Sequence, residues 1–247
     1  MKFKLICCEV LMREACRLIA DCPHTIDPEF TPKGAHEDSL KLHDIIQAAV
    51  DNASKKNEYD AILLGFGLCG NALVDVASSG IPLVIPRAHD CCTIFLGSRE
   101  LFKQYFSDNP SMEWSSASYM ERGDSYIREG SVGKMMGLDK SYEQLEAEYG
   151  SENATFIWET LHPEQHSSEM IYINIPGTEN LRYLEKFNTL ACETNRSIKL
   201  INGDMRLLKG LLYGDWNSKE YLIINNREKI KGVYDYDEVI AVDTSNS

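Results

Sequence analysis

The sequence predicts an α/β protein with two Rossmann-like halves, each built on a mainly parallel sheet, and a cleft between the halves. Apolar segments alternate with amphipathic ones along most of the chain, as in folds that place helices over parallel strands. The segment DAILLGFG at 60–67 is apolar throughout, which is typical of a strand buried on both faces. A second alternating set begins at residue 170. We therefore expect one half over residues 1–135 and another over 136–247.

The N-terminal half is expected to alternate strictly between strands and helices. Its strands are expected at 3–8, 26–32, 60–67 and 81–88. Its helices are expected at 9–22, 39–54, 71–79 and 91–108. Two prolines in the segment 26–32 favour an edge position for that strand, because proline cannot donate to the hydrogen-bond ladder.

The C-terminal half repeats the alternation after a segment without a clear pattern. Residues 109–135 are rich in serine, glycine and charge, and would form a lid or an excursion between the halves. One or two helices, broken near Gly150, are expected over 141–162. The next elements are expected at 170–176 (strand), 180–195 (helix), 197–202 (strand) and 205–216 (helix). Two closing strands would flank a turn at Lys231 and Gly232.

The composition excludes several classes of function. The chain has 247 residues and is 43% hydrophobic and 26% charged, as in ordinary soluble globular proteins. Its formal net charge of −13 argues against a nucleic-acid partner and against docking on anionic lipid, because both need a basic surface. No stretch resembles a membrane span, and charged residues interrupt the apolar start too early for a signal peptide. We therefore expect a cytoplasmic protein.

Three of the eight cysteines follow predicted strands at the point where each strand ends. Cys8 ends the first strand, Cys69 follows the strand at 60–67, and Cys91 follows the strand at 81–88. The carboxyl ends of neighbouring parallel strands meet at one edge of a sheet, where ligands usually bind. Reduced thiolates are strong ligands for zinc and for iron–sulfur clusters. The sequence therefore predicts a thiolate-ligated metal at this edge.

Residues beside these cysteines would complete the site. His89 is a candidate fourth ligand, which would suit zinc, whereas three cysteines alone would leave one iron of a four-iron cluster open for substrate. Gly67 and Gly70 would let the backbone approach a bulky centre. Asp90 would orient His89 or cap a helix. The competing interpretation is that the cysteines are small buried hydrophobes, as is expected for Cys7 and Cys92. Cys16, Cys22 and Cys192 lie on predicted helices or at their ends and are expected to be structural.

The segment GFGLCG at 65–70 also matches the Gly-x-Gly-x-x-Gly pattern of dinucleotide-binding loops. The pattern requires an acidic residue about 20 positions on, and this chain has IPRAH there. Arg87 would suit a 2′-phosphate, and an anion would fit at Asn71. An NAD(P)-dependent oxidoreductase is therefore an alternative to the metal site.

The motifs GLCGN, RAHDC and LGSRE, together with ICCEVL and NGDMRLLKGLL, resemble a family known mainly as a domain of unknown function. The resemblance covers most of the chain and carries over to Cys8, Cys69, Gly70, Asn71, Arg87, His89, Asp90 and Cys91. Members occur in anaerobic bacteria and methanogens and are often encoded near corrinoid-dependent methyltransferases. This context implies a role in methylamine, methoxyl or corrinoid metabolism. Residues 109–135 differ from the family, because they lack its aromatic and proline-rich sequence.

The motifs and the resemblance together suggest a metal-binding protein of corrinoid-linked methyl-group metabolism. If it is an enzyme, a metal-dependent methyltransferase is the expected activity. Zinc would act as a Lewis acid that keeps the thiol of a small-molecule substrate ionised, and an iron–sulfur cluster would serve if the site is redox-active. A corrinoid protein is the expected partner. The non-catalytic alternative is an accessory protein that delivers a metal or a corrinoid.

Overall fold

The computed structural model describes residues 1–108, 112–123, 141–151, 153–155, 169–225, 227–233, 235 and 237–243. Part of the segment 109–135, and the end of the region 141–162, lie outside the described residues. Within the described part, the chain forms a mixed α/β fold with a mainly parallel sheet, a smaller parallel sheet and a short antiparallel pair of strands. The α/β class expected from the alternating pattern is therefore confirmed.

The larger sheet has five described strands in the order β2-β1-β3-β4-β8. They are β1 (Lys2–Cys8), β2 (Thr25–Thr31), β3 (Ala61–Gly65), β4 (Leu83–Pro86) and β8 (Tyr221–Ile224). The first four are parallel, and β8 runs antiparallel to β4. β2 lies at the edge, as Pro28 within it and Pro32 just after it predict. β3 is buried at every position, as expected for a central strand covered on both faces.

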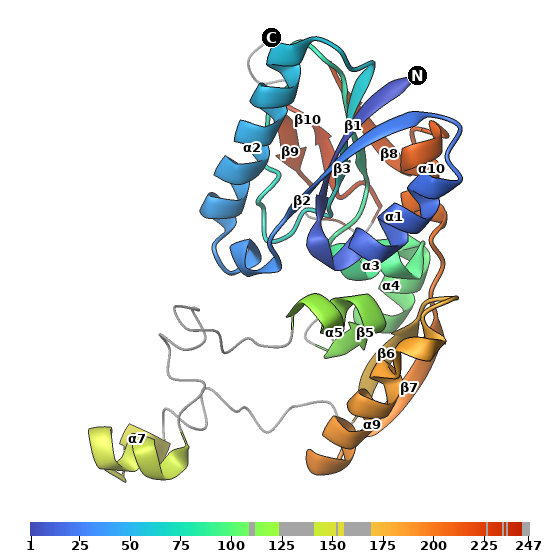
Figure 1. Ribbon diagram of the computed structural model, residues 1–247. Helices are drawn as coiled ribbons and strands as arrows, with labels where there is room; N and C mark the ends of the chain where they lie inside the picture. Colours follow the sequence, from blue (N-terminus) through green and yellow to red (C-terminus); the bar gives the residue numbers. More distant parts are fainter. Residues whose placement is uncertain are drawn as a thin grey trace.

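Helices cover both faces of this sheet (Figure 1). α2 (Ser39–Lys56) lies on one face, while α1 (Met12–Ala20) and α10 (Arg206–Tyr213) lie on the other and pack against each other. α2 places a buried apolar stripe against the sheet, formed by Leu42, Ile46, Ala49, Val50 and Ala53. This spacing of three and four residues is the one that puts side chains on a single helix face.

The smaller sheet has three described strands, all parallel, in the order β5-β6-β7. They are β5 (Trp114–Ser116), β6 (Glu169–Asn174) and β7 (Ser197–Asn202), and α9 (Tyr183–Glu193) packs against them. This sheet lies beyond the carboxyl ends of the larger sheet (Figure 1). Ile173 of β6 and Ile201 of β7 belong to the same buried apolar cluster as the strands of the larger sheet. The two sheets therefore share a continuous core.

The two sheets do not divide the chain at residue 135. β5 precedes that position but belongs to the smaller sheet, whereas α10 and β8 follow it and pack with the larger sheet. β8 pairs with the outer edge of β4 and so becomes the last strand of the larger sheet. The sequence of β4 does not reveal this pairing.

The other described elements are short. They are η1 (Glu9–Leu11), η2 (Lys33–Glu37), α3 (Cys91–Leu96), α4 (Arg99–Phe106), α5 (Ala117–Gly123), α7 (Tyr142–Tyr149), η3 (Glu179–Leu181), β9 (Ile230–Gly232) and β10 (Ile240–Val242). α7 ends at Gly150, where the sequence predicts a break. No helix among the described residues is long and apolar enough to cross a membrane.

Three expectations about local structure are wrong. Residues 71–79 form turns and an isolated bridge instead of a helix, because Asn71 and Asp75 have positive φ angles of 72° and 66°. The single helix expected over 91–108 is divided into α3 and α4, because Gly97 adopts a φ of +69° and ends the first helix. Lys231 and Gly232 lie within β9 instead of forming the turn between two strands.

Candidate thiol site at the end of the larger sheet

Three segments that carry cysteines meet at the carboxyl edge of the larger sheet. The loop after β3 is hydrogen-bonded to the loop after β4, because the Leu68 amide donates to the Ala88 carbonyl (2.8 Å) and the Cys69 amide donates to the His89 carbonyl (3.0 Å). β1 lies next to β3, and Cys7 pairs with Gly65 in the register of the two strands. The parallel register therefore carries Cys8 to the same edge as the other two segments.

Gly67 allows the two loops to pack this closely. A Cβ atom at Gly67 would lie 2.4 Å from the backbone nitrogen of Asp90 and 2.5 Å from its Cα. No side chain fits at that separation, so a glycine is required at Gly67. The first glycine of the GLCGN motif therefore allows close contact between the two backbones. Gly70 differs, since a Cβ there would meet nothing within 4 Å.

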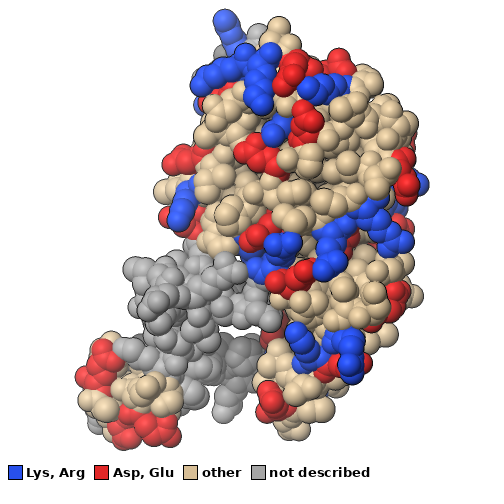
Figure 2. Space-filling model, in the orientation of Figure 1, with Lys and Arg blue, Asp and Glu red and all other residues tan. Residues whose placement is uncertain are grey.

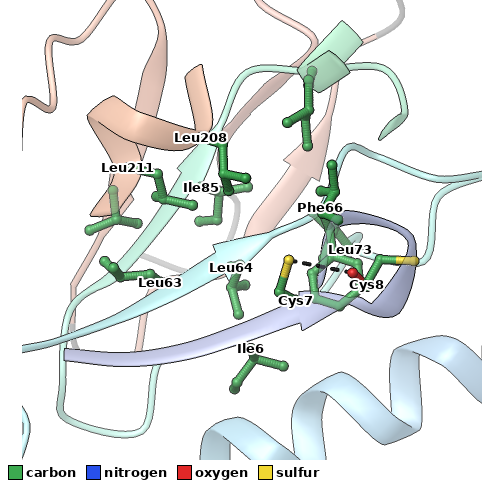
Figure 3. Close-up of a cluster of buried hydrophobic side chains, with 14 of the residues drawn as sticks. Ile6, Cys7, Cys8, Leu63, Leu64, Phe66, Leu73, Ile85, Leu208 and Leu211 are labelled. Atoms are coloured by element: carbon green, nitrogen blue, oxygen red, sulfur yellow. Dashed lines mark hydrogen bonds between the residues drawn. The ribbon is translucent and has the colours of Figure 1, made fainter. Parts of the chain in front are cut away.

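Cys7 and Cys8 have separate roles although they are neighbours. Their sulfur atoms point away from each other, and the Cys7 thiol donates a hydrogen bond to the Cys8 carbonyl at 3.5 Å (Figure 3). Cys7 is fully buried, and a Cβ at Gly65 would lie 2.5 Å from its sulfur, so Cys7 fills the space above that glycine. Cys7 is therefore a packing residue, as the alternation of side chains along a strand predicts.

Cys8, Cys69 and Cys91 influence one another electrostatically. Burial raises the pKa of Cys8 to about 12. Burial also raises the pKa of Cys69, and the negative charges of Cys8 and Asp90 raise it further. The pKa of Cys91 is raised well above its usual value by burial, then by Asp90, Cys69 and Cys8. The three thiols are therefore neutral at pH 7 in the absence of a cation.

The backbone at Cys69 is in an unusual conformation. Cys69, Gly70 and Asn71 are three successive residues with positive φ, at 48°, 64° and 72°. Glycine and asparagine adopt this left-handed region readily, but for other residues it costs about 1–2 kcal/mol. The Cys69 side chain is partly buried against the apolar core in spite of this backbone conformation. Such strain is typical of functional positions, which supports a chemical role for the Cys69 thiol.

We expect the variant Cys69→Gly to be more stable than Cys69→Ala by about 1 kcal/mol, because both lose the thiol but only glycine relieves the left-handed backbone. Unfolding in urea measures the difference. Cys192 provides the matched control, because it is exposed on α9, where alanine should instead be more stable than glycine by about 1 kcal/mol. Equal stabilities of the two Cys69 variants would show that the backbone there is unstrained.

Asp90 and His89 of the RAHDC motif fix the position of the loop after β4. Asp90 caps α3, since its Oδ1 accepts hydrogen bonds from the Thr93 amide (3.1 Å) and the Thr93 hydroxyl (3.4 Å). Burial raises the pKa of Asp90 to about 6. The His89 ring stacks on Phe102 of α4 with centroids 5.2 Å apart, and burial lowers the pKa of His89. His89 thus lies against α4, and Asp235 and Arg99 are among its charged neighbours.

Arg87 connects the same motif to the C-terminal segment. Its Nε donates to the Ser218 carbonyl (3.1 Å), and its Nη1 donates to the carbonyls of Glu238 (3.1 Å) and Ile240. Three of the five N–H groups of the guanidinium are therefore bound to backbone oxygens. Burial lowers the pKa of Arg87. The structure thus gives Arg87 a tethering role that its sequence context does not indicate.

The cysteines and their neighbours are not arranged as a complete set of metal ligands. Among the residues that the structure describes, no group of three or more His, Cys, Asp or Glu is placed so that it could hold a metal ion. The dinucleotide interpretation also lacks one required element. A dinucleotide-binding loop leads into a helix after its third glycine, here Gly70, but residues 71–79 form no helix. Asn71 lies in this turn with its Oδ1 near Gly232 of β9.

The fold and the site define a mixed α/β protein in which cysteines gather at the carboxyl ends of parallel strands. The chain belongs to the family described as protein of unknown function (DUF1638), whose model matches residues 30–212. This membership confirms the resemblance drawn from the GLCGN and RAHDC motifs. The match includes Cys69 and Cys91 and begins after Cys8. No curated protein and no solved structure matches the chain.

Proposed function

We propose that Cys8, Cys69 and Cys91 bind a soft metal centre, zinc or an iron–sulfur cluster, and that the protein acts in corrinoid-linked methyl-group metabolism. One observation carries the first part of the proposal. Three cysteines lie at or just after the ends of three adjacent strands, at one edge of a sheet, and the two loops after β3 and β4 are hydrogen-bonded together. The second part rests on the family resemblance.

The electrostatics of the thiols explain why a metal would bind there. Each thiol that ionises raises the pKa of its neighbours, so the cluster resists the loss of protons. A divalent cation or a cluster iron would offset this repulsion and would convert three neutral thiols into thiolate ligands. Because the thiols are not preassembled around one point, binding requires their side chains to turn toward a common centre.

The number of thiols leaves room for a substrate. Catalytic zinc sites keep one coordination position open, and three protein ligands would do so here. His89 is stacked on Phe102, so a fourth protein ligand would require this ring to move. Zinc would supply a Lewis acid that keeps a substrate thiol ionised at neutral pH. The best-supported arrangement is therefore three cysteines with an exchangeable fourth position.

Zinc titration of the reduced, metal-free protein tests the proposal. We expect one zinc ion to bind and roughly three protons to be released at pH 7, because each of the three thiols loses its proton on binding. An indicator dye in weak buffer measures the protons, and competition with a coloured chelator measures the affinity. The affinity should fall as the pH is lowered, because protons compete for the same sulfurs.

Single replacements identify the ligands. Cys8→Ser, Cys69→Ser and Cys91→Ser should each weaken zinc binding by more than about tenfold. Cys16→Ser on α1 and Cys192→Ser on α9 are matched controls, because both cysteines are exposed and lie on helices. The same variants of protein purified without oxygen test the iron–sulfur alternative by their visible absorbance. The proposal is overturned if the protein holds neither centre, or if the three variants bind like the controls.

A second assay separates the enzyme from the accessory alternative. Metal-loaded protein is mixed with methylcobalamin and a small thiol. In catalytic transfer, the thiolate sulfur takes the methyl group, the cobalt–carbon bond breaks and its electron pair remains on cobalt as cob(I)alamin. An enzyme would give many equivalents of cob(I)alamin and thioether for each protein chain. Metal transfer to an acceptor, without such turnover, would instead support the delivery alternative.

A further inference from the structure

A large cavity lies between α1 and the carboxyl ends of β6 and β7. Its volume is about 1070 Å³, which is sufficient for a molecule of cofactor size. α1 supplies one wall, and the segments after β6 and β7, including Gly177, Gly203 and Asp204, supply another. The crevice beyond the carboxyl ends of parallel strands is the usual place for a ligand in such sheets. Cys8, Cys69 and Cys91 are not among the residues that line it.

The wall contains a buried carboxyl group with an unused oxygen. Glu14 of α1 is only 4% exposed, and its Oε1 accepts a hydrogen bond from the Ser118 hydroxyl at 2.6 Å. Its Oε2 is buried and has no hydrogen-bond partner among the described residues. A buried carboxylate oxygen without a partner is costly, so native proteins rarely leave one. A molecule in the cavity that carries an N–H or O–H group would satisfy it once the Glu14 side chain rotates toward the cavity.

Arginines surround the same cavity. Arg13, Arg17, Arg122 and Arg206 line it together with the acidic residues Glu14, Glu121 and Asp204, so its lining is slightly basic although the chain as a whole carries a net charge of −13. Figure 2 shows basic side chains gathered at the narrowing between the larger and the smaller sheet. Arg13 and Arg206 are paired with Glu121 and Glu220.

Arg17 is held at this cavity by the backbone that follows β6. Its Nη1 donates to the Pro176 carbonyl at 2.6 Å, and its remaining N–H groups have no hydrogen-bond partner among the residues that the structure describes. A Cβ at Gly177 would lie 2.1 Å from the Arg17 Nη1 atom, so the glycine makes room for the guanidinium. An arginine positioned in this way is suited to bind a carboxylate or a phosphate group.

We propose that this cavity binds an organic anion of cofactor size with an apolar body and a hydrogen-bond donor. The acidic group would lie against Arg17 and Arg206, and the donor would meet the Oε2 atom of Glu14. The apolar body would lie on Met12, Leu101 and Ile175, which also line the cavity. The site is separate from the thiols and does not depend on the proposed metal.

The fluorescent probe 1-anilinonaphthalene-8-sulfonate has the required chemistry, because it combines an anionic group, an apolar ring system and an N–H group. We expect the full chain to bind it at one saturable site. Arg17→Ala and Arg206→Ala should each weaken binding by roughly tenfold, as expected for the loss of a charge-assisted hydrogen bond. Lys41→Ala on α2 is the charge-matched control and should bind like the unchanged protein, because Lys41 does not line the cavity.

Glu14 requires a different comparison. The unchanged protein should prefer the anilino probe to 1-naphthalenesulfonate, which lacks the N–H group, and Glu14→Met should remove this preference. A purely structural Glu14 would instead lower the unfolding midpoint and leave the preference intact. Displacement by ADP or by citrate tells whether a phosphate or a carboxylate is the natural acidic group. The proposal is wrong if neither displaces the probe, or if the arginine variants bind it normally.

Discussion

Replacing Gly67 by alanine should destabilise the protein by about 2–3 kcal/mol and abolish metal binding at the thiols. The added Cβ would lie within 2.8 Å of three backbone atoms of Asp90, and backbone cannot rotate away as a side chain can. Overpacking of this kind usually costs about 1–3 kcal/mol. The two loops must therefore separate, which breaks the hydrogen bonds from Leu68 and Cys69 and moves the Cys69 thiol away from Cys91.

Gly70→Ala is the matched control for this prediction. Its Cβ would meet no atom within 4 Å, so the loops should stay together. Its φ of +64° should still cost about 1 kcal/mol, because alanine is strained in the left-handed region. Urea unfolding and zinc titration should thus separate the two variants, with Gly70→Ala slightly less stable but still able to bind. If both variants bind zinc normally, close contact between the loops is not needed to form the site.

The placement of the three cysteine-bearing segments at one edge of the sheet could be predicted, because it depends on a general property of parallel sheets. Cys8, Cys69 and Cys91 are far apart in sequence, but each follows a strand, and adjacent parallel strands end at one edge. The edge position of β2 could likewise be predicted from Pro28, since the reason is local to the residue. Features that depend on strand order or on one residue type are therefore accessible from sequence.

Features that depend on distant contacts could not be predicted. The sequence places Glu14 on a helix, but only the position of α1 above the smaller sheet shows that its carboxyl group lines a cavity. The turns at 71–79 contain Asn71 and Asp75 in left-handed conformations, which their residue types permit but do not require. In the sequence alone, Arg87 resembles an anion-binding residue. Its carbonyl partners lie more than 130 positions later in the chain, so the sequence does not reveal that they bind the guanidinium.

Replacing Arg87 by alanine should lower the free energy of unfolding by about 3 kcal/mol. The guanidinium binds the carbonyls of Ser218, Glu238 and Ile240, and its loss leaves one partly buried acceptor, the Ile240 carbonyl, and two exposed ones without their charged donor. Each hydrogen bond to a charged group contributes about 1.5–3 kcal/mol, and water replaces part of this where the side chain is accessible. The C-terminal segment that includes β10 should loosen first, because two of the three carbonyls belong to it.

Hydrogen exchange and urea unfolding test this prediction together. Arg87→Ala should speed amide exchange over residues 237–243 before it affects β1 or β3. Arg87→Lys keeps the positive charge but lacks the planar fork that reaches three carbonyls, so it should recover only part of the stability. If Arg87 instead binds a ligand phosphate, both variants should keep full stability and lose retention on an NADP-eluted dye column. A stable Arg87→Ala variant would therefore revive the nucleotide alternative and would disprove the tether.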